Sequence, residues 1–123
     1  MSSPADDIAD LLEEVGFQNV FVSREPSSPD ETITLYDTPG GSPLDYSLDF
    51  RQPNIQVRIR AIDYKDAFTN QGLVFNFLTS TEKQTSNFRY VGFELVGDFS
   101  SLGRDEKDRV VTVSNYRVLR HPK

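Results

Sequence analysis

The chain has 123 residues, which is enough for one modest hydrophobic core, and it carries a formal net charge of −6. It contains no cysteine, which excludes disulfides, thiolate catalysis and cysteine-bound zinc, and its one histidine cannot build a histidine metal site. Nucleophile motifs and phosphate-binding fingerprints are absent from the sequence, so we predict a protein without catalytic residues, metal or cofactor.

The sequence also lacks the pattern of a secreted or membrane protein. Its first residues are polar and acidic where the apolar part of a signal peptide would begin. The longest apolar run, residues 73–75, is far too short to span a bilayer. We therefore expect a soluble protein made in a cytoplasm, with no membrane partner.

Residues 3–15 predict an amphipathic helix. Ser3 suits the N-cap, Pro4 suits the first helical position and Gly16 suits the C-terminal stop. Apolar residues recur at helical spacing along one side: Ile8, Leu11, Leu12 and Val15. Acidic residues cover the other sides, and we interpret them as a solvent-exposed face: Asp6, Asp7, Asp10, Glu13 and Glu14.

Two short strands are predicted next. Residues 17–23 form a short apolar run, and residues 32–36 alternate, with Ile33 and Leu35 on the inward face. Between these strands, residues 25–30 have the composition of a turn or loop.

The stretch 53–68, PNIQVRIRAIDYKDAF, predicts a strand that runs directly into the main helix. Its apolar side chains alternate with polar ones, which is the period of a half-buried strand: Ile55, Val57, Ile59 and Ala61. Asp63 then suits a helix N-cap, and apolar residues follow at helical spacing as far as Leu78. The connection between strand and helix is one or two residues long.

The segment between the second strand and this central strand, residues 38–53, is a long loop by composition. It begins with Pro39, Gly40 and Gly41 and continues with apolar residues that alternate with polar ones: Leu44, Tyr46, Leu48 and Phe50. Long loops in small domains are usually functional. Three interpretations stay open, namely a loop that packs its aromatic residues beneath itself, a short extra strand, and an arm that packs on a neighbouring subunit.

The last third of the chain predicts two more strands. Residues 79–87 are polar and indicate a turn, and residues 88–96 indicate a strand with Val91, Phe93 and Leu95 inward. Residues 97–108 form a second long loop. Residues 110–119 indicate a long final strand, and its inward face slips near Ser114 and Asn115, which suggests a β-bulge there.

Together these elements predict a single α+β domain, residues 1–123. We expect a small mixed or antiparallel sheet of about five strands, with the N-terminal helix and the central helix packed on it. The strand–helix–strand order from residue 55 to residue 96 would allow one parallel pair. The expected core is Ile55, Val57, Ile59, Phe68, Phe75, Leu78, Val91, Phe93 and Leu95.

Charge is distributed unevenly along the sequence. Residues 1–50 hold eleven acids and one base, a net charge of −10, whereas residues 51–123 have a net charge of +4. One interpretation is ordinary solvated surfaces, and the other is a protein whose copies meet head to tail. Basic side chains on the strands allow nucleic-acid contact, but the acidic overall balance argues against a dedicated nucleic-acid binder.

Two stretches of the chain resemble the small minor-capsid or tail-terminator proteins of long-tailed bacteriophages. They are residues 33–41, ITLYDTPGG, and residues 53–68, PNIQVRIRAIDYKDAF. The resemblance implies a non-enzymatic structural protein of the virion, located in the tail or neck and present in the host cytoplasm during assembly. Alternatives are a head–tail connector or head-completion protein and, in a different class, a monomeric soluble binding or regulatory domain.

The resemblance also implies partners. Such proteins form a ring, typically hexameric, that caps the head-proximal end of the tail tube and contacts both the tube protein and a neck or head-completion protein. DNA would pass through the ring lumen without specific binding. We expect the subunit interface to lie in the two long loops and on the basic strand faces, at Pro39, Gly40, Gly41, Tyr46, Phe50, Arg58, Arg60, Arg104 and Arg117.

Overall fold

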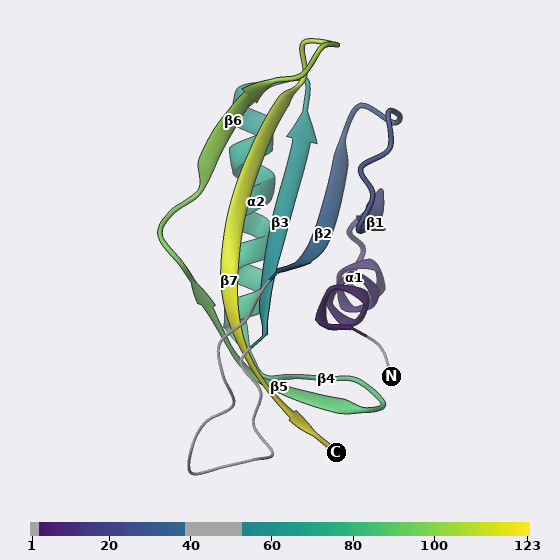
Figure 1. The fold of residues 1–123 in the computed structure, drawn as a ribbon, viewed down its shortest axis with the longest axis vertical. Helices are drawn as coiled ribbons and strands as arrows, with labels where there is room; N and C mark the ends of the chain where they lie inside the picture. Colours follow the sequence, from purple (N-terminus) through teal and green to yellow (C-terminus); the bar gives the residue numbers. More distant parts are fainter. Residues whose placement is uncertain (1–2, 39–52) are drawn as a thin grey trace.

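The computed structural model describes residues 3–38 and 53–123, which form two helices and seven strands (Figure 1). In chain order these are α1 (Pro4–Glu14), β1 (Val20–Val22), β2 (Thr32–Thr38), β3 (Asn54–Ala61), α2 (Tyr64–Ser80), β4 (Lys83–Gln84), β5 (Phe88–Leu95), β6 (Ser100–Arg104) and β7 (Val110–Pro122). The interface predictions at Pro39, Gly40, Gly41, Tyr46 and Phe50 lie outside the described residues.

The described strands form one mixed sheet in the order β1-β2-β3-β7-β5-β4, and β6 pairs with β7 as well. The α+β class is confirmed, but the sheet is larger than the predicted five strands. The two additional strands, β4 and β6, lie in segments that the sequence indicated as a turn and a loop. They are short and pair through their backbones, so they leave little hydrophobic period in the sequence.

The parallel pair is not the one that the strand–helix–strand order suggested. β3 precedes α2 in the chain and β5 follows it, and the two strands run in the same direction. In the sheet, however, β7 lies between them and is antiparallel to both. The parallel pair of the sheet is β1 with β2. The prediction of a β3–β5 pair is therefore wrong, because the long final strand pairs with both of them.

The start of the chain folds as its local signals predict. The Ser3 hydroxyl accepts a hydrogen bond from the Asp6 backbone N–H at 3.1 Å, and Gly16 ends the helix region with a φ of 103°. Ile8 and Leu12 of α1 are fully buried against the sheet. Asp37 at the end of β2 accepts the Ala5 N–H at 3.0 Å, which ties α1 to the sheet.

The prediction that all five acidic residues of α1 face solvent is wrong at Asp7. Asp6, Asp10, Glu13 and Glu14 are exposed, but Asp7 is only 4% exposed and accepts a hydrogen bond from the Tyr90 hydroxyl at 2.5 Å. Burial, together with this hydrogen bond, raises the pKa of Tyr90 above its ordinary value. The carboxylate therefore joins α1 to β5 instead of facing solvent.

The core prediction holds for Ile55, Val57, Ile59 and Leu78, which are buried in the main cluster. Phe68 is half-buried outside that cluster, and Phe75, Phe93 and Leu95 are half-buried and pack against it. Val91 lies outside the core. The reason is a register shift between Tyr90 and Gly92 in β5, so that Phe88 and Tyr90 are the buried residues of this strand.

The bulge predicted in the last strand near Ser114 and Asn115 is also wrong. β7 pairs with β3 without interruption from Val110 to Arg117. The apparent slip arises because both faces of its first half are buried, from Val110 through Ser114. Two-sided burial removes the alternation on which the sequence argument depended.

Candidate interaction surface

Both helices pack on one face of the sheet, and the opposite face carries no helix. Cluster residues from α1, α2, β2 and β3 meet on the helix-covered side. Because side chains alternate along a strand, the residues between the core positions point to the other side, which we call the helix-free face. Its outward positions include Thr32, Thr34, Tyr36, Gln56, Arg58, Arg60, Gly92, Glu94, Val111, Val113, Asn115, Arg117 and Leu119.

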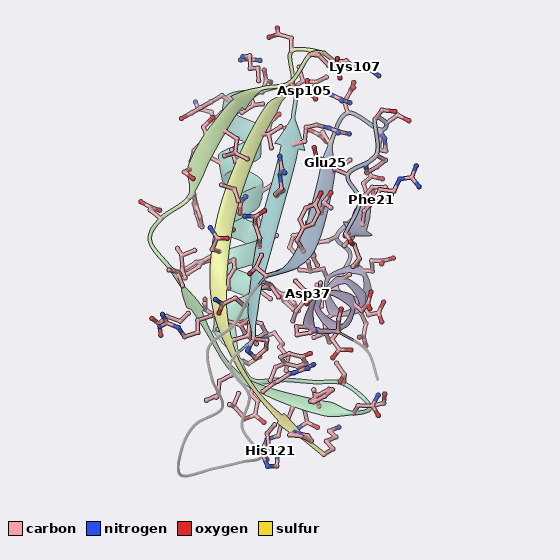
Figure 2. All side chains as sticks on the ribbon, viewed as in Figure 1. Phe21, Glu25, Asp37, Asp105, Lys107 and His121 are labelled. Atoms are coloured by element: carbon pink, nitrogen blue, oxygen red, sulfur yellow. The ribbon has the colours of Figure 1, made fainter. Side chains whose placement is uncertain are left out.

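One part of the helix-free face is closed by residues 23–31, the loop between β1 and β2. Arg60 is 2% exposed and donates to the carbonyl oxygens of Pro29 at 2.6 Å and Asp30 at 3.1 Å. Arg109 donates to the Ser27 carbonyl. Figure 2 shows Glu25 of this loop beside β2 and β3. Buried guanidinium groups thus hold the loop down through its backbone.

The same loop pairs, through Glu25, with two of the arginines predicted to lie at a subunit interface, Arg58 and Arg60. Glu25 lies 3.8 Å from Arg58 Nε and 3.7 Å from Arg60 Nη1 within one chain. Burial, helped by the nearby charge of Arg109, lowers the pKa of Arg60 from its ordinary value, while Glu25 opposes that effect. The Arg58 side chain is 32% exposed, and Arg60 offers almost no surface. Their place at a subunit interface stays a prediction.

Replacing Arg60 with Met is expected to release this loop. The substitution keeps the packing of the aliphatic stem but leaves the Pro29 and Asp30 carbonyls without their donors, at a cost of about 1–3 kcal/mol. Hydrogen exchange should show faster exchange for residues 23–31. Arg24→Met, at an exposed position in the same loop, is the matched control. Identical exchange in the two variants would contradict the assigned role of Arg60.

The other two predicted arginines are exposed and pair locally. Arg117 on β7 lies 3.0 Å from Glu94 on β5, and their side chains are 50% and 68% exposed. Arg104 at the end of β6 lies 3.7 Å from Asp108 and donates to its carbonyl at 2.9 Å. Arg104 begins the β6–β7 connection, in which Figure 2 labels Asp105 and Lys107. Exposed pairs of this kind contribute little to stability, so both arginines are available to a partner.

A hollow lies beside Arg117 on the helix-free face. It encloses about 300 Å³ and is lined by Gly92, Phe93, Glu94, Arg117, Val118 and Leu119. Gly92 and Leu119 are not among the residues predicted from the sequence to lie at an interface. A glycine inside a predicted strand was the available signal, because such a residue often marks a bulge or a close approach of another chain.

The described residues contain no group of three or more histidine and acidic side chains that could hold a metal ion. Neither described helix is long and apolar enough to cross a membrane. The main surface features of the described residues are the helix-free face, the loop 23–31 that Arg60 and Arg109 hold against it (the pinned loop), and the hollow.

Comparison with protein families decides the class. The family model described as "Bacteriophage tail terminator protein" matches residues 5–120, nearly the whole chain. The chain belongs to the bacteriophage tail terminator family. A search among curated proteins found no match. Membership of a tail terminator family indicates a structural protein of the virion tail that associates with other tail proteins, in agreement with the resemblance seen in the sequence.

Proposed function

We propose that this tail terminator assembles into a ring, the hexamer that the resemblance implies, and caps the head-proximal end of the tail tube. The cap stops addition of further tube rings and presents its other side to a neck or head-completion protein. The family match over residues 5–120 carries this proposal. The exposed positions of the helix-free face, among them Glu94, Asn115 and Arg117, supply a surface on which a neighbour can pack.

Capping requires two unlike surfaces and an open centre. One surface must complement the last tube ring, and the other must not template another ring, since otherwise growth would continue. DNA must slide through the lumen, and a net charge of −6 disfavours binding of phosphates there. Three acids on α1, Asp10, Glu13 and Glu14, are exposed and make no ion pair within the described residues. Unpaired acidic side chains of this kind suit such a lumen.

The function is tested with a phage that lacks this gene. Electron micrographs should then show tails of unregulated, excessive length, and the purified chain should restore uniform tails that carry the labelled protein at the head-proximal end. A connector would instead leave tails of normal length unattached to heads. A monomeric regulatory domain would leave both tail length and head attachment unchanged.

Deleting residues 40–48 is expected to abolish capping without unfolding the domain. The described helices and strands lie outside this segment, which carries apolar Tyr46 in a region predicted to meet other chains. Circular dichroism should show a retained cooperative melt, while the variant fails to restore tail length. Replacing the nine residues with a Gly/Ser linker of equal length controls for the change in loop length. A deletion variant that still caps tails would rule out an assembly role for residues 40–48.

A further inference from the structure

The pinned loop, residues 23–31, is held to the sheet by few links. Among the described residues, its one backbone hydrogen bond to a strand runs from the Ser23 N–H to the Leu35 carbonyl at 2.8 Å. Beyond Ser23, the hydrogen bonds that tie the loop down come from two guanidinium groups, those of Arg60 and Arg109, which donate to carbonyl oxygens of the loop. A segment with so few links opens at a lower free energy than the whole domain unfolds.

The turn between β6 and β7 fixes the second of these guanidinium groups. The Asp105 carboxylate accepts from the Arg109 Nε at 2.9 Å and from the Arg109 backbone N–H at 2.9 Å, and the Lys107 N–H donates to it at 3.0 Å. The same guanidinium donates to the Ser27 carbonyl of the pinned loop. Figure 2 labels Asp105 and Glu25 of the pinned loop at the same end of the sheet. Asp105 therefore acts on a loop that lies far from it in the sequence.

Polar side chains are buried where the pinned loop meets the helix-free face. Thr32 and Thr34 of β2 are 2% and 0% exposed. Their cross-strand neighbours are Arg60 and Arg58, and Glu25 of the loop lies 3.7 and 3.8 Å from these two arginines. Among the described residues, neither threonine hydroxyl has a hydrogen-bond partner, and the same holds for Arg58 Nε and Glu25 Oε2. Buried polar atoms without partners disfavour the closed loop, because water reaches them when the loop opens.

We propose that the pinned loop is a lid over the Thr32 and Thr34 part of the helix-free face, and that Asp105 latches this lid through Arg109. While the loop is closed, both threonine hydroxyls are hidden from any neighbour, and opening of the loop adds them to the available surface. The Asp105 side chain is 23% exposed, so a neighbouring chain can reach the latch from solvent. The lid is a property of the single chain and does not depend on the proposed ring.

A thiol beneath the pinned loop measures its opening, since the native chain has no cysteine. Thr34→Cys places the thiol at a position that is 0% exposed, so a water-soluble maleimide reacts with it only when the loop opens. Adding Asp105→Asn should speed this labelling at least tenfold, because an amide NH2 would replace the oxygen that accepts from the Arg109 guanidinium. Asp108→Asn is the matched control in the same turn, where the Asp108 side chain is 86% exposed, and it should leave the labelling rate unchanged.

A second thiol distinguishes opening of the pinned loop from unfolding of the domain. Val57→Cys lies in the main core cluster, at a position that is 0% exposed, and is labelled only when the core opens. In the same background it should react at least tenfold more slowly than Thr34→Cys. Low concentrations of urea should speed labelling at position 57 more than at position 34, because global unfolding exposes more surface.

Two results would overturn the proposal. Equal labelling rates at positions 34 and 57 would mean that only global unfolding exposes Thr34. Equal labelling of Thr34→Cys in the Asp105→Asn and Asp108→Asn backgrounds would mean that Asp105 is not the latch.

Discussion

Truncating Ile59 to Ala is expected to lower the free energy of unfolding by about 2–5 kcal/mol. Ile59 is 1% exposed in the second half of β3, where it contributes to the main core cluster beneath the two helices. Removal of its three distal carbons loses transfer free energy and leaves a cavity that the surrounding strands cannot fully close. Chemical denaturation monitored by circular dichroism measures the loss.

Ile62 is the matched control for this measurement. It is the same residue type three positions later, but it is 56% exposed between β3 and α2. Ile62→Ala should change the free energy of unfolding by no more than about 0.5 kcal/mol. Equal losses at the two positions would mean that the register of β3 is not the one described.

Replacing Gln71 with Leu is expected to cost about 2–4 kcal/mol, although it makes the helix more apolar. Gln71 is fully buried on α2 and its amide nitrogen donates to the Val57 carbonyl at 3.2 Å and to the Thr112 hydroxyl at 3.1 Å. Its amide oxygen accepts from the Ser114 hydroxyl at 2.7 Å. A leucine at position 71 would leave the Val57 carbonyl and the Thr112 and Ser114 hydroxyls buried without the Gln71 amide as a partner. Thermal or urea unfolding measures the resulting loss of stability.

A compensating variant separates this network from simple packing. The Thr112 hydroxyl keeps a partner in Gln71→Leu, because it donates to the Ile59 carbonyl at 3.0 Å, whereas the Ser114 hydroxyl loses the Gln71 amide oxygen. Combining Gln71→Leu with Ser114→Ala removes the stranded hydroxyl, and part of the lost stability should return. Asn76→Leu, on the exposed side of the same helix, controls for helix propensity and should be nearly neutral. If the double variant is less stable than Gln71→Leu alone by the full effect of Ser114→Ala, the Gln71 and Ser114 side chains are not energetically coupled.

Features set by neighbours in the sequence were predictable from it. The Ser3 cap, the stop at Gly16 and the alternation through Ile55 and Ile59 depend on contacts within a few residues, so the local pattern suffices. The N-terminus of α2 at Asp63 was also located, although the Asp63 side chain makes no capping hydrogen bond. The resemblance carried by residues 33–41 and 53–68 likewise indicated the family that matches residues 5–120.

Features that need partners far along the chain were decided only by the tertiary structure. Asp7 is buried because Tyr90, 83 residues later, donates to it, and Arg60 is buried because the loop at Pro29 and Asp30 supplies its acceptors. β7 separates β3 from β5, since backbone pairing carries no side-chain signature in the sequence. The hollow at Gly92 likewise exists only where the bulged strand meets Leu119 of β7. The amino-acid sequence by itself thus determined the elements with a strong local pattern, α1, β3 and the start of α2, whereas long-range pairing determined β4, β6, the buried face of β5 and the surface.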